Sequence, residues 1–294
     1  IYYSMFGFQR VGDSAWQAGD MRARGFMLGA TAGRTTLNGE GLQHEDGQSQ
    51  VQASFIPNVR SYDPTFAFEV VTIVQRGMQR MLAEQQDEYW YLTLMNENYV
   101  HPDMPEGSAE GIIKGMYLLK DAGKGKKGEL RVQLMGSGTI LREVIAAADL
   151  LDADFGIKAD IWSCPSFNEL ARDGVDAERW NRLHPEAKAP RKPWVTQQLE
   201  GRSGPAIAAT DYVRHFANQV REYVPMRYSV LGTDGYGRSD TRANLRRHFE
   251  VDRFHVAHAA VAALAADGKL TPKDVARAIK LYKLDAEKPN PIGV

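Results

Sequence analysis

The sequence has one cysteine, almost no net charge and no long apolar run, and each shortage excludes a class of protein. Cys164 cannot form an internal disulfide, so a reducing compartment and a cytoplasmic location are expected. No apolar run approaches the roughly 20 residues that span a bilayer. Lys and Arg total 36 against 37 Asp and Glu, so no basic field favours nucleic acid or a membrane surface. The expected partners are therefore neutral molecules, small anions or other proteins.

The beginning of the chain lacks an initiator methionine, a charged leader and a signal-peptide pattern. Residues 1–6 are instead aromatic and strand-like. We expect this chain to be part of a longer one. Its 294 residues and 43% hydrophobic content predict about two globular domains.

Strand-like and helix-like patterns alternate along the chain, which predicts an α/β fold with parallel sheets. The Asp63-Pro64 pair is expected to start a helix, because Asp caps free amides and Pro suits the first helical position. Prolines at 102 and 105 mark an exit from the first domain. Expected strands are 26–31, 89–95, 130–135, 159–163, 194–199, 205–209 and 228–231, and expected helices cover 7–24, 63–81, 140–151, 211–222, 253–266 and 272–283.

The glycine-rich stretch 35–50 is the first candidate for chemistry, because it follows an apolar strand and ligand crevices open at the carboxyl ends of parallel strands. His44 can titrate near neutral pH or hydrogen-bond a carboxylate substrate, and Glu40 is close enough in sequence to share its pocket. The alternative is a polar turn with exposed acids. A metal site fits less well, because the next histidine is His101.

Two further motifs favour structural interpretations. Gly136-Ser-Gly138 imitates the start of a dinucleotide fingerprint, but Leu141 replaces the third glycine, so a tight strand-to-helix turn is expected. Cys164 lies at the end of an apolar run with no base near it in sequence, which favours a buried structural thiol.

The glycine-rich loop 232–240 leads into a basic segment. Because a capped helix tolerates cations along an exposed side, we expect a helix with a solvated basic face, and the alternative is an anion or partner-protein contact. The basic residues are Arg242, Arg246, Arg247 and His248.

Three segments together resemble a known family: IYYSMFGFQR at 1–10, GATAGRTTLNGEGLQHEDG at 29–47 and LGTDGYGRSD at 231–240. They closely resemble the homodimeric, thiamin-diphosphate-dependent first components of bacterial pyruvate dehydrogenase complexes, and the similarity covers essentially the whole chain. The resemblance implies an α/β protein in which 1–105 is the later part of the pyrimidine-binding (middle) domain. It also implies that 106–294 is a transketolase-type C-terminal domain.

The resemblance also implies site residues in the aromatic start and the glycine-rich loop. The ring of Phe6, which from pattern alone would be ordinary core, would stack on the aminopyrimidine of the cofactor. Tyr3 and His44 would line the pocket for the pyruvate carboxylate, and Glu40 would belong to the same active centre. A phenol and an imidazole suit this task, because they donate hydrogen bonds and move protons.

Other parts of the family pattern are missing. The family holds its diphosphate and magnesium through Gly-Asp-Gly followed by Asn-Asn, and here the partial echo at residues 12–14 has no Asn-Asn after it. The glutamate that protonates the aminopyrimidine is also absent. The magnesium ligands are therefore expected in a preceding part of a longer chain, and this portion is expected to be inactive alone.

The implied activity is the oxidative decarboxylation of pyruvate, with transfer of the acetyl unit to a lipoyl group of the dihydrolipoyl acetyltransferase. Implied partners are the lipoyl and subunit-binding domains of that acyltransferase and a second copy of the chain. Two alternatives stay open. One is a transketolase or another 2-oxo acid dehydrogenase, and the other is a non-catalytic dimerisation or interaction module.

Overall fold

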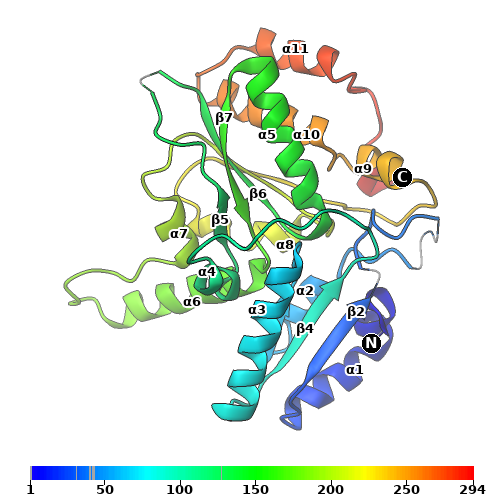
Figure 1. Cartoon of the computed structure of the whole chain (residues 1–294), viewed down its shortest axis with the longest axis vertical. Helices are drawn as coiled ribbons and strands as arrows, with labels where there is room; N and C mark the ends of the chain where they lie inside the picture. The colour runs from blue at the N-terminus through cyan, green and yellow to red at the C-terminus, as the bar shows by residue number, and fades with distance from the viewer. Residues whose placement is uncertain (1, 31, 40, 42–43, 127) are drawn as a thin grey trace.

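A computed structural model describes residues 2–30, 32–39, 41, 44–126 and 128–294, and the side chains of residues 2–7 lie outside that description. Its strands form two sheets, one before and one after the irregular segment 95–106 (Figure 1). The α/β fold with parallel sheets is thus confirmed. The domain division at 105/106 stays a prediction.

The first sheet has four parallel strands in the order β1-β2-β4-β3. Helices run between successive strands. Parallel pairing requires such crossovers, because a hairpin turn can join only antiparallel neighbours. The strands are β1 (Tyr2–Tyr3), β2 (Phe26–Ala30), β3 (Val59–Tyr62) and β4 (Tyr89–Leu94), and the helices are α1 (Ser4–Asp20), α2 (Ser49–Ser54) and α3 (Ala67–Met78), which continues as the π-helix Gln79–Ala83.

The second sheet has the order β5-β7-β6-β8-β9, with β5 antiparallel at one edge and the other pairs parallel. Its strands are β5 (Tyr117–Lys120), β6 (Arg131–Gly136), β7 (Lys158–Ser163), β8 (Ala206–Ala209) and β9 (Tyr228–Leu231). The helices of this half are α4 (Ala109–Lys114), α5 (Leu141–Phe155), α6 (Phe167–Leu183), α7 (Trp194–Leu199), α8 (His215–Asn218), α9 (Arg242–His248), α10 (Arg253–Ala266) and α11 (Pro272–Leu281), with short 3-10 turns at 138–140, 221–223 and 291–293.

The central strands of the second sheet are buried on both faces, which explains their near-continuous apolar sequences. Along β6, Val132 and Leu134 pack with α5 and α10, whereas Met135 packs on the other side with Phe167 and Phe216. This alternation follows from the two-residue repeat of a strand. The strand-helix-strand unit of β6, α5 and β7 agrees with its prediction.

Two helical predictions need correction, one at its start and one along its length. Asp63 does not cap the helix after β3, because α3 begins at Ala67 and the Glu69 carboxylate accepts the amide hydrogen of Phe66 at 3.0 Å. The predicted helix 211–222 is broken into the four-residue α8 and a 3-10 turn.

The strand predicted at 194–199 is wrong, since these residues form α7. Val195 and Leu199 are both fully buried, and their spacing of four places them on one helical face. The β-branched residues Val195 and Thr196 suggested a strand, but tertiary burial decides the conformation. The short elements α2, β3, α4 and β5 and the long helix α6 were not predicted.

The two halves meet across buried carboxyl groups. Glu69 of α3 accepts hydrogen bonds from the hydroxyls of Tyr117, at 2.7 Å, and Ser163, at 2.6 Å, which belong to the second sheet. Asp63 accepts one from Thr93 at 2.7 Å in the first half and one from Ser137 at 2.8 Å in the second. Because these acceptors and donors are buried and paired with each other, they fix the relative placement of the two sheets.

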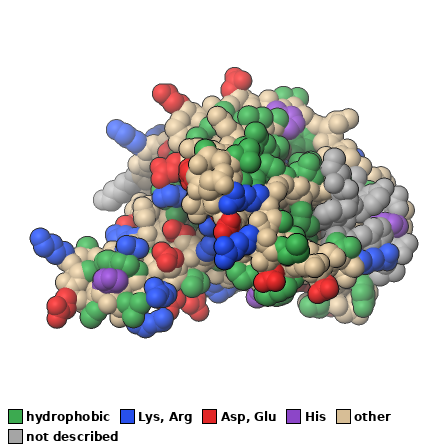
Figure 2. Space-filling model, turned by 90° about the horizontal axis from the view of Figure 1, so that it is seen from below, with side chains coloured by type: hydrophobic (Ala, Val, Ile, Leu, Met, Phe, Trp, Pro, Cys, Tyr) green, Lys and Arg blue, Asp and Glu red, His purple; other side chains and the backbone are tan. Residues whose placement is uncertain are grey.

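The outer surface carries cations and carboxylates side by side, without a large patch of one sign on the face that Figure 2 shows. This mixture agrees with the net charge of -1. Among the described residues no helix is long and apolar enough to cross a membrane.

Candidate active site

The candidate site lies at the carboxyl ends of the parallel strands of the first sheet. Tyr3 is opposite Ala30 in the register of β1 and β2, so the chain enters α1 beside the point where the glycine-rich loop begins. We call this loop the histidine loop and use the name for its described residues, 32–39, 41 and 44–47. The fold thereby brings the aromatic start of the chain and His44 to one edge of the sheet.

The predicted site residues are only partly described. His44 is half-buried, and its backbone amide donates to the carbonyl of Gly41 at 3.2 Å. The side chains of Tyr3 and Phe6, and the whole of Glu40, lie outside the described residues. Their grouping around His44 stays a prediction.

The acids that follow His44 are buried, so the alternative of a turn with exposed acids is wrong for Glu45 and Asp46. Asp46 accepts hydrogen bonds from the backbone amides of Gln48 and Ser49, at 3.0 and 2.9 Å, and from the hydroxyl of Ser49. It thereby satisfies free amides at the start of α2. The hydroxyl of Tyr91 on β4 donates to Ser49 at 2.8 Å, which ties the end of the loop to the sheet.

Glu45 joins the histidine loop to the loop 232–240, which we call the glycine loop. Its Oε2 accepts the backbone amide hydrogen of Arg238 at 2.7 Å. Burial raises the pKa of Glu45 to about 7, against the lowering effects of that amide and of Arg34. A carboxyl group beside His44 can therefore gain or lose a proton near neutral pH.

Arg34 is fully buried between the same two loops. Its guanidinium donates to the carbonyl of Gly235 in the glycine loop, and a Cβ on Gly47 would lie 2.0 Å from its Nη2. Burial lowers the pKa of Arg34, while Asp46 and Asp211 oppose that shift. The arrangement gives the loop junction a buried cation with several carboxylates around it.

Asp211, just after β8, holds the first turn of the histidine loop. Its carboxylate accepts from the amide of Thr35 at 3.0 Å, the hydroxyl of Thr35 at 2.7 Å and the hydroxyl of Thr36 at 2.9 Å. Burial raises the pKa of Asp211 to about 6, opposed by the charge of Arg246. The histidine loop is thus fastened at its start by Asp211 and near its end by Glu45.

The basic segment after the glycine loop forms α9, capped by Thr241, whose hydroxyl accepts from the amide of Asn244 at 3.3 Å. Its expected solvated face needs correction, because Arg246 is buried and pairs with Glu97. Arg242 donates from Nε to the carbonyl of Thr36 at 2.8 Å. This helix therefore contacts the histidine loop instead of facing solvent alone.

Sequence reasoning missed Arg34, Asp211 and the burial of Glu45. Asp211 could have been found, because it lies two positions after the apolar strand β8, at the carboxyl end of a parallel strand where ligand sites usually form. Arg34 and Glu45 gave no such signal, since their partners in the glycine loop lie about two hundred positions away. Cys164 is buried as predicted, and burial raises the pKa of its thiol well above its ordinary value.

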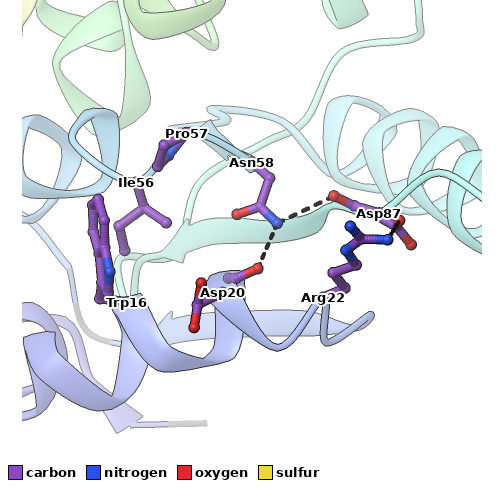
Figure 3. A pocket seen from close by; sticks show the side chains of 8 residues that line it. Trp16, Asp20, Arg22, Ile56, Pro57, Asn58 and Asp87 are labelled. Carbon is purple, nitrogen blue, oxygen red and sulfur yellow. Dashed lines mark hydrogen bonds and ion pairs between the residues drawn. The ribbon is translucent and has the colours of Figure 1, made fainter.

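A separate hollow of about 490 Å³ lies at the opposite edge of the first sheet, lined by Trp16, Asp20, Asn58 and Asp87 among others (Figure 3). These residues precede strands β2, β3 and β4, so the hollow is at their amino ends. Because the histidine loop follows β2, the hollow and His44 are at different edges. Among the described residues no group of three His, Cys, Asp or Glu side chains could hold a metal ion.

Comparison with known families places both halves of the chain. Residues 1–102 match the pyruvate dehydrogenase E1 component middle domain, and residues 115–252 match the transketolase-like C-terminal domain. The chain is 60% identical over 294 residues to the pyruvate dehydrogenase E1 component of Cupriavidus necator, covering 100% of this chain and 33% of that protein. Along its whole length the chain is thus similar to a C-terminal portion of pyruvate dehydrogenase E1 components.

Other E1 components are similar to the same extent. That of Pseudomonas aeruginosa is 61% identical, over 99% of this chain and 33% of the relative, and that of Escherichia coli K12 is 56% identical, over 99% and 32%. The chain spans about a third of the length of these relatives and corresponds to a C-terminal portion of them.

Solved structures of transketolases share the fold. The enzyme from Campylobacter jejuni superimposes with a TM-score of 0.63 at 16% identity, over 89% of this chain and 35% of that one. Transketolase of Pichia stipitis in complex with sedoheptulose 7-phosphate gives 0.63 at 16% identity, over 92% and 35%. At these identities the likeness concerns the fold alone.

Proposed function

We propose that the whole protein containing this chain decarboxylates pyruvate with thiamin diphosphate and passes the acetyl unit to the lipoyl group of a dihydrolipoyl acetyltransferase. The observation that carries the proposal is the identity of 60% with a pyruvate dehydrogenase E1 component along the entire chain. An E1 homodimer acting in a multienzyme complex in the cytoplasm, with docking to the acyltransferase, is part of the same proposal.

Thiamin diphosphate fits the described part of the site. The strand register puts the backbone at the start of α1 beside the histidine loop, which supports the proposal that Phe6 and His44 serve one site. An aromatic face suits an aminopyrimidine, and a carboxyl edge of parallel strands is a usual place for a cofactor. When bound, thiamin diphosphate supplies the carbanion chemistry and the electron sink. The ligands of its magnesium are expected from residues outside this chain.

The residues of this chain have distinct proposed tasks. Phe6 orients the cofactor ring by stacking. Tyr3 and His44 donate hydrogen bonds to the pyruvate carboxylate, and His44 holds and moves a proton beside it. Glu40 belongs to the same active centre. The histidine loop can hold His44 in place because Asp211 and Glu45 anchor it on either side.

The decisive experiment is carbon dioxide release by the full-length parent protein with thiamin diphosphate and magnesium. Carbon dioxide release from pyruvate is compared with release from 2-oxoglutarate, in the wild type and in His44→Ala and Tyr3→Phe. Because a ketose phosphate releases no carbon dioxide, transfer of its two-carbon unit to an aldose is measured separately. We expect pyruvate-selective release and a loss of about 10²-fold or more for His44→Ala, since a proton-transfer group contributes about 10²- to 10⁴-fold. Preference for another donor would favour a transketolase or a different 2-oxo acid dehydrogenase, and full activity in both variants would refute the site.

A non-catalytic role for this chain alone is the second candidate, since it spans only a third of its relatives. Titration of the 294-residue chain with thiamin diphosphate separates the two. Saturable tight binding would exclude a chain without cofactor affinity, and no binding would support a dimerisation or interaction module.

A further inference from the structure

We infer that Glu45 is a positioning residue for His44: its carboxyl group fastens the histidine loop to the glycine loop from the other half of the chain. The inference rests on the proposed function, because that function assigns the reaction that His44 serves. Through this contact the C-terminal half helps to position a site whose proposed residues all come from the first half.

The first step of the argument is the contact itself. Glu45 has no exposed surface, and its Oε2 accepts the backbone amide hydrogen of Arg238 at 2.7 Å. Its Oε1 has no hydrogen-bond partner among the described residues. Burying a carboxyl group costs free energy that a neutral side chain of similar size would not require. Oε2 binds a backbone amide of the glycine loop, and this contact indicates that Glu45 holds the two loops together.

The second step is the fit of the two loops against each other. A Cβ on Gly237 would lie 2.7 Å from Oε2 of Glu45 and 2.9 Å from its Cβ. Gly237 has no positive φ, so close approach, and not backbone conformation, requires glycine there. On the other side of His44, a Cβ on Gly41 would lie 2.6 Å from the hydroxyl of Ser239. The glycine loop therefore contacts the histidine loop both before and after His44.

The third step is the set of additional ties between the halves. The amide of Val213 donates to the carbonyl of Gly47 at 2.9 Å, and the guanidinium of Arg34 donates to Gly235. In Figure 1 the loop after β2 and the segment that leads into α9 run along the same side of the molecule. These ties hold the loop at positions away from His44, whereas Glu45 directly follows it, so we expect release of Glu45 to displace the backbone next to His44. Misplacement of a catalytic group by about 1 Å can cost about 10²-fold in rate.

Steady-state kinetics of the full-length protein with pyruvate test the inference. We expect Glu45→Ala to lower kcat about 10- to 100-fold and to raise KM for pyruvate, because His44 also binds its carboxylate, while the affinity for thiamin diphosphate stays within about threefold of wild type. Glu45→Gln keeps an oxygen that accepts from Arg238, so it should recover most of the kcat. If Glu45→Ala acted through a general loss of folding, the fraction of active protein would fall, and Glu45→Gln would not recover the kcat.

The glycine loop supplies an independent variant of the same contact. Gly237→Ala should lower kcat as Glu45→Ala does, and the double variant should lose little more, because both changes break one interaction. Gly293→Ala is the matched control, since a Cβ there meets nothing within 4 Å and the residue has no positive φ.

Hydrogen exchange at the Arg238 amide gives a readout that does not depend on activity. Glu45→Ala should exchange this amide at least about tenfold faster than wild type and Glu45→Gln should restore protection, as expected for an amide that loses its acceptor. Unchanged exchange, or unchanged kcat in an active protein, would overturn the inference. If the wild type releases no carbon dioxide from pyruvate, the proposed function fails, and exchange at Arg238 alone decides whether Glu45 holds the loops together.

Discussion

The carboxylate of Asp211 accepts hydrogen bonds from both the backbone amide and the hydroxyl of Thr35, at 3.0 and 2.7 Å, across 176 positions of the chain. Asp211 follows a strand of the second sheet, yet it sets the path of a loop that leaves the first sheet. The candidate site is therefore a joint product of the two halves, although its proposed catalytic residues come from one of them.

Removal of that carboxylate should destabilise the chain strongly. In Asp211→Ala the amide of Thr35 and two buried hydroxyls lose their acceptor, and each unpaired buried donor costs about 1–3 kcal/mol. We expect the free energy of unfolding to fall by about 3 kcal/mol or more in urea titrations. The control is Asp152→Ala, which removes only a half-exposed ion pair with Lys158 and should cost less than about 1 kcal/mol. Equal losses in the two variants would contradict this account.

Gly33 is required for a different reason, because its neighbour leaves no room for a side chain. Gly33 and Gly39 both have positive φ, +91° and +84°, so alanine at either position costs about 1–2 kcal/mol of backbone strain. A Cβ at Gly33 would also lie 2.2 Å from Oδ2 of Asp211, whereas one at Gly39 meets none of the described residues within 4 Å. Gly33→Ala should therefore lower the urea midpoint clearly more than Gly39→Ala. The explanation fails if both variants unfold at the same midpoint.

Local pattern predicted β2, β4, β6, β7, β8 and β9, because buried parallel strands are continuous apolar runs that need no knowledge of distant residues, but it missed β3 and β5. It also predicted α10 at residues 253–266, whose bounds the structure reproduces. It failed at 194–199, where β-branched composition favoured a strand and the burial of Val195 and Leu199 produced a helix. Composition alone could not separate these outcomes, since the packing partners decide them.

The polar framework of the site was harder to predict than the fold. Glu45 and Arg246 read as surface charges, because nothing near them in sequence pairs with them. Their partners, the Arg238 amide and the Glu97 carboxylate, come from the opposite half of the chain. Only the direction of β2 and the resemblance to the family marked the loop as a site, and neither indicates which acids are buried.

Asp63 gives the junction of the halves a defined pH dependence. Burial raises its pKa from 3.8 to about 7, opposed by the hydroxyls of Thr93 and Ser137. Between these pH values the folded state keeps a proton on Asp63 that the unfolded state has released. The contribution of this proton to the free energy of unfolding is therefore fully present below about pH 4 and is lost as the pH rises to about 7. The difference corresponds to on the order of 4 kcal/mol. Asp63→Asn removes the titration, so its stability relative to wild type should rise from pH 4 to 7.

Urea titrations of wild type and Asp63→Asn at several pH values measure this difference directly. Above about pH 7 Asp63 is ionised in both the folded and the unfolded state. The free energies of unfolding of the two proteins should then change with pH in parallel. Curves that stay parallel from pH 4 to 7 would show that Asp63 does not titrate as its burial requires.

Phe6 is expected to act on the cofactor without acting on the core, and its neighbour Phe8 provides the matched comparison. Phe8 is buried, with its ring centroid 4.7 Å from that of Tyr91 in an edge-on arrangement, so it packs against β4. Phe6→Ala removes the proposed stacking face, which with the lost apolar contact corresponds to about 2 kcal/mol, or about 30-fold in Kd for thiamin diphosphate. Phe8→Leu should lower the midpoint of unfolding while leaving that Kd within about threefold. Isothermal titration of the full-length variants with thiamin diphosphate and magnesium, beside their thermal unfolding, separates the two effects. A cofactor Kd that Phe6→Ala leaves unchanged would remove Phe6 from the site and return it to the aromatic core.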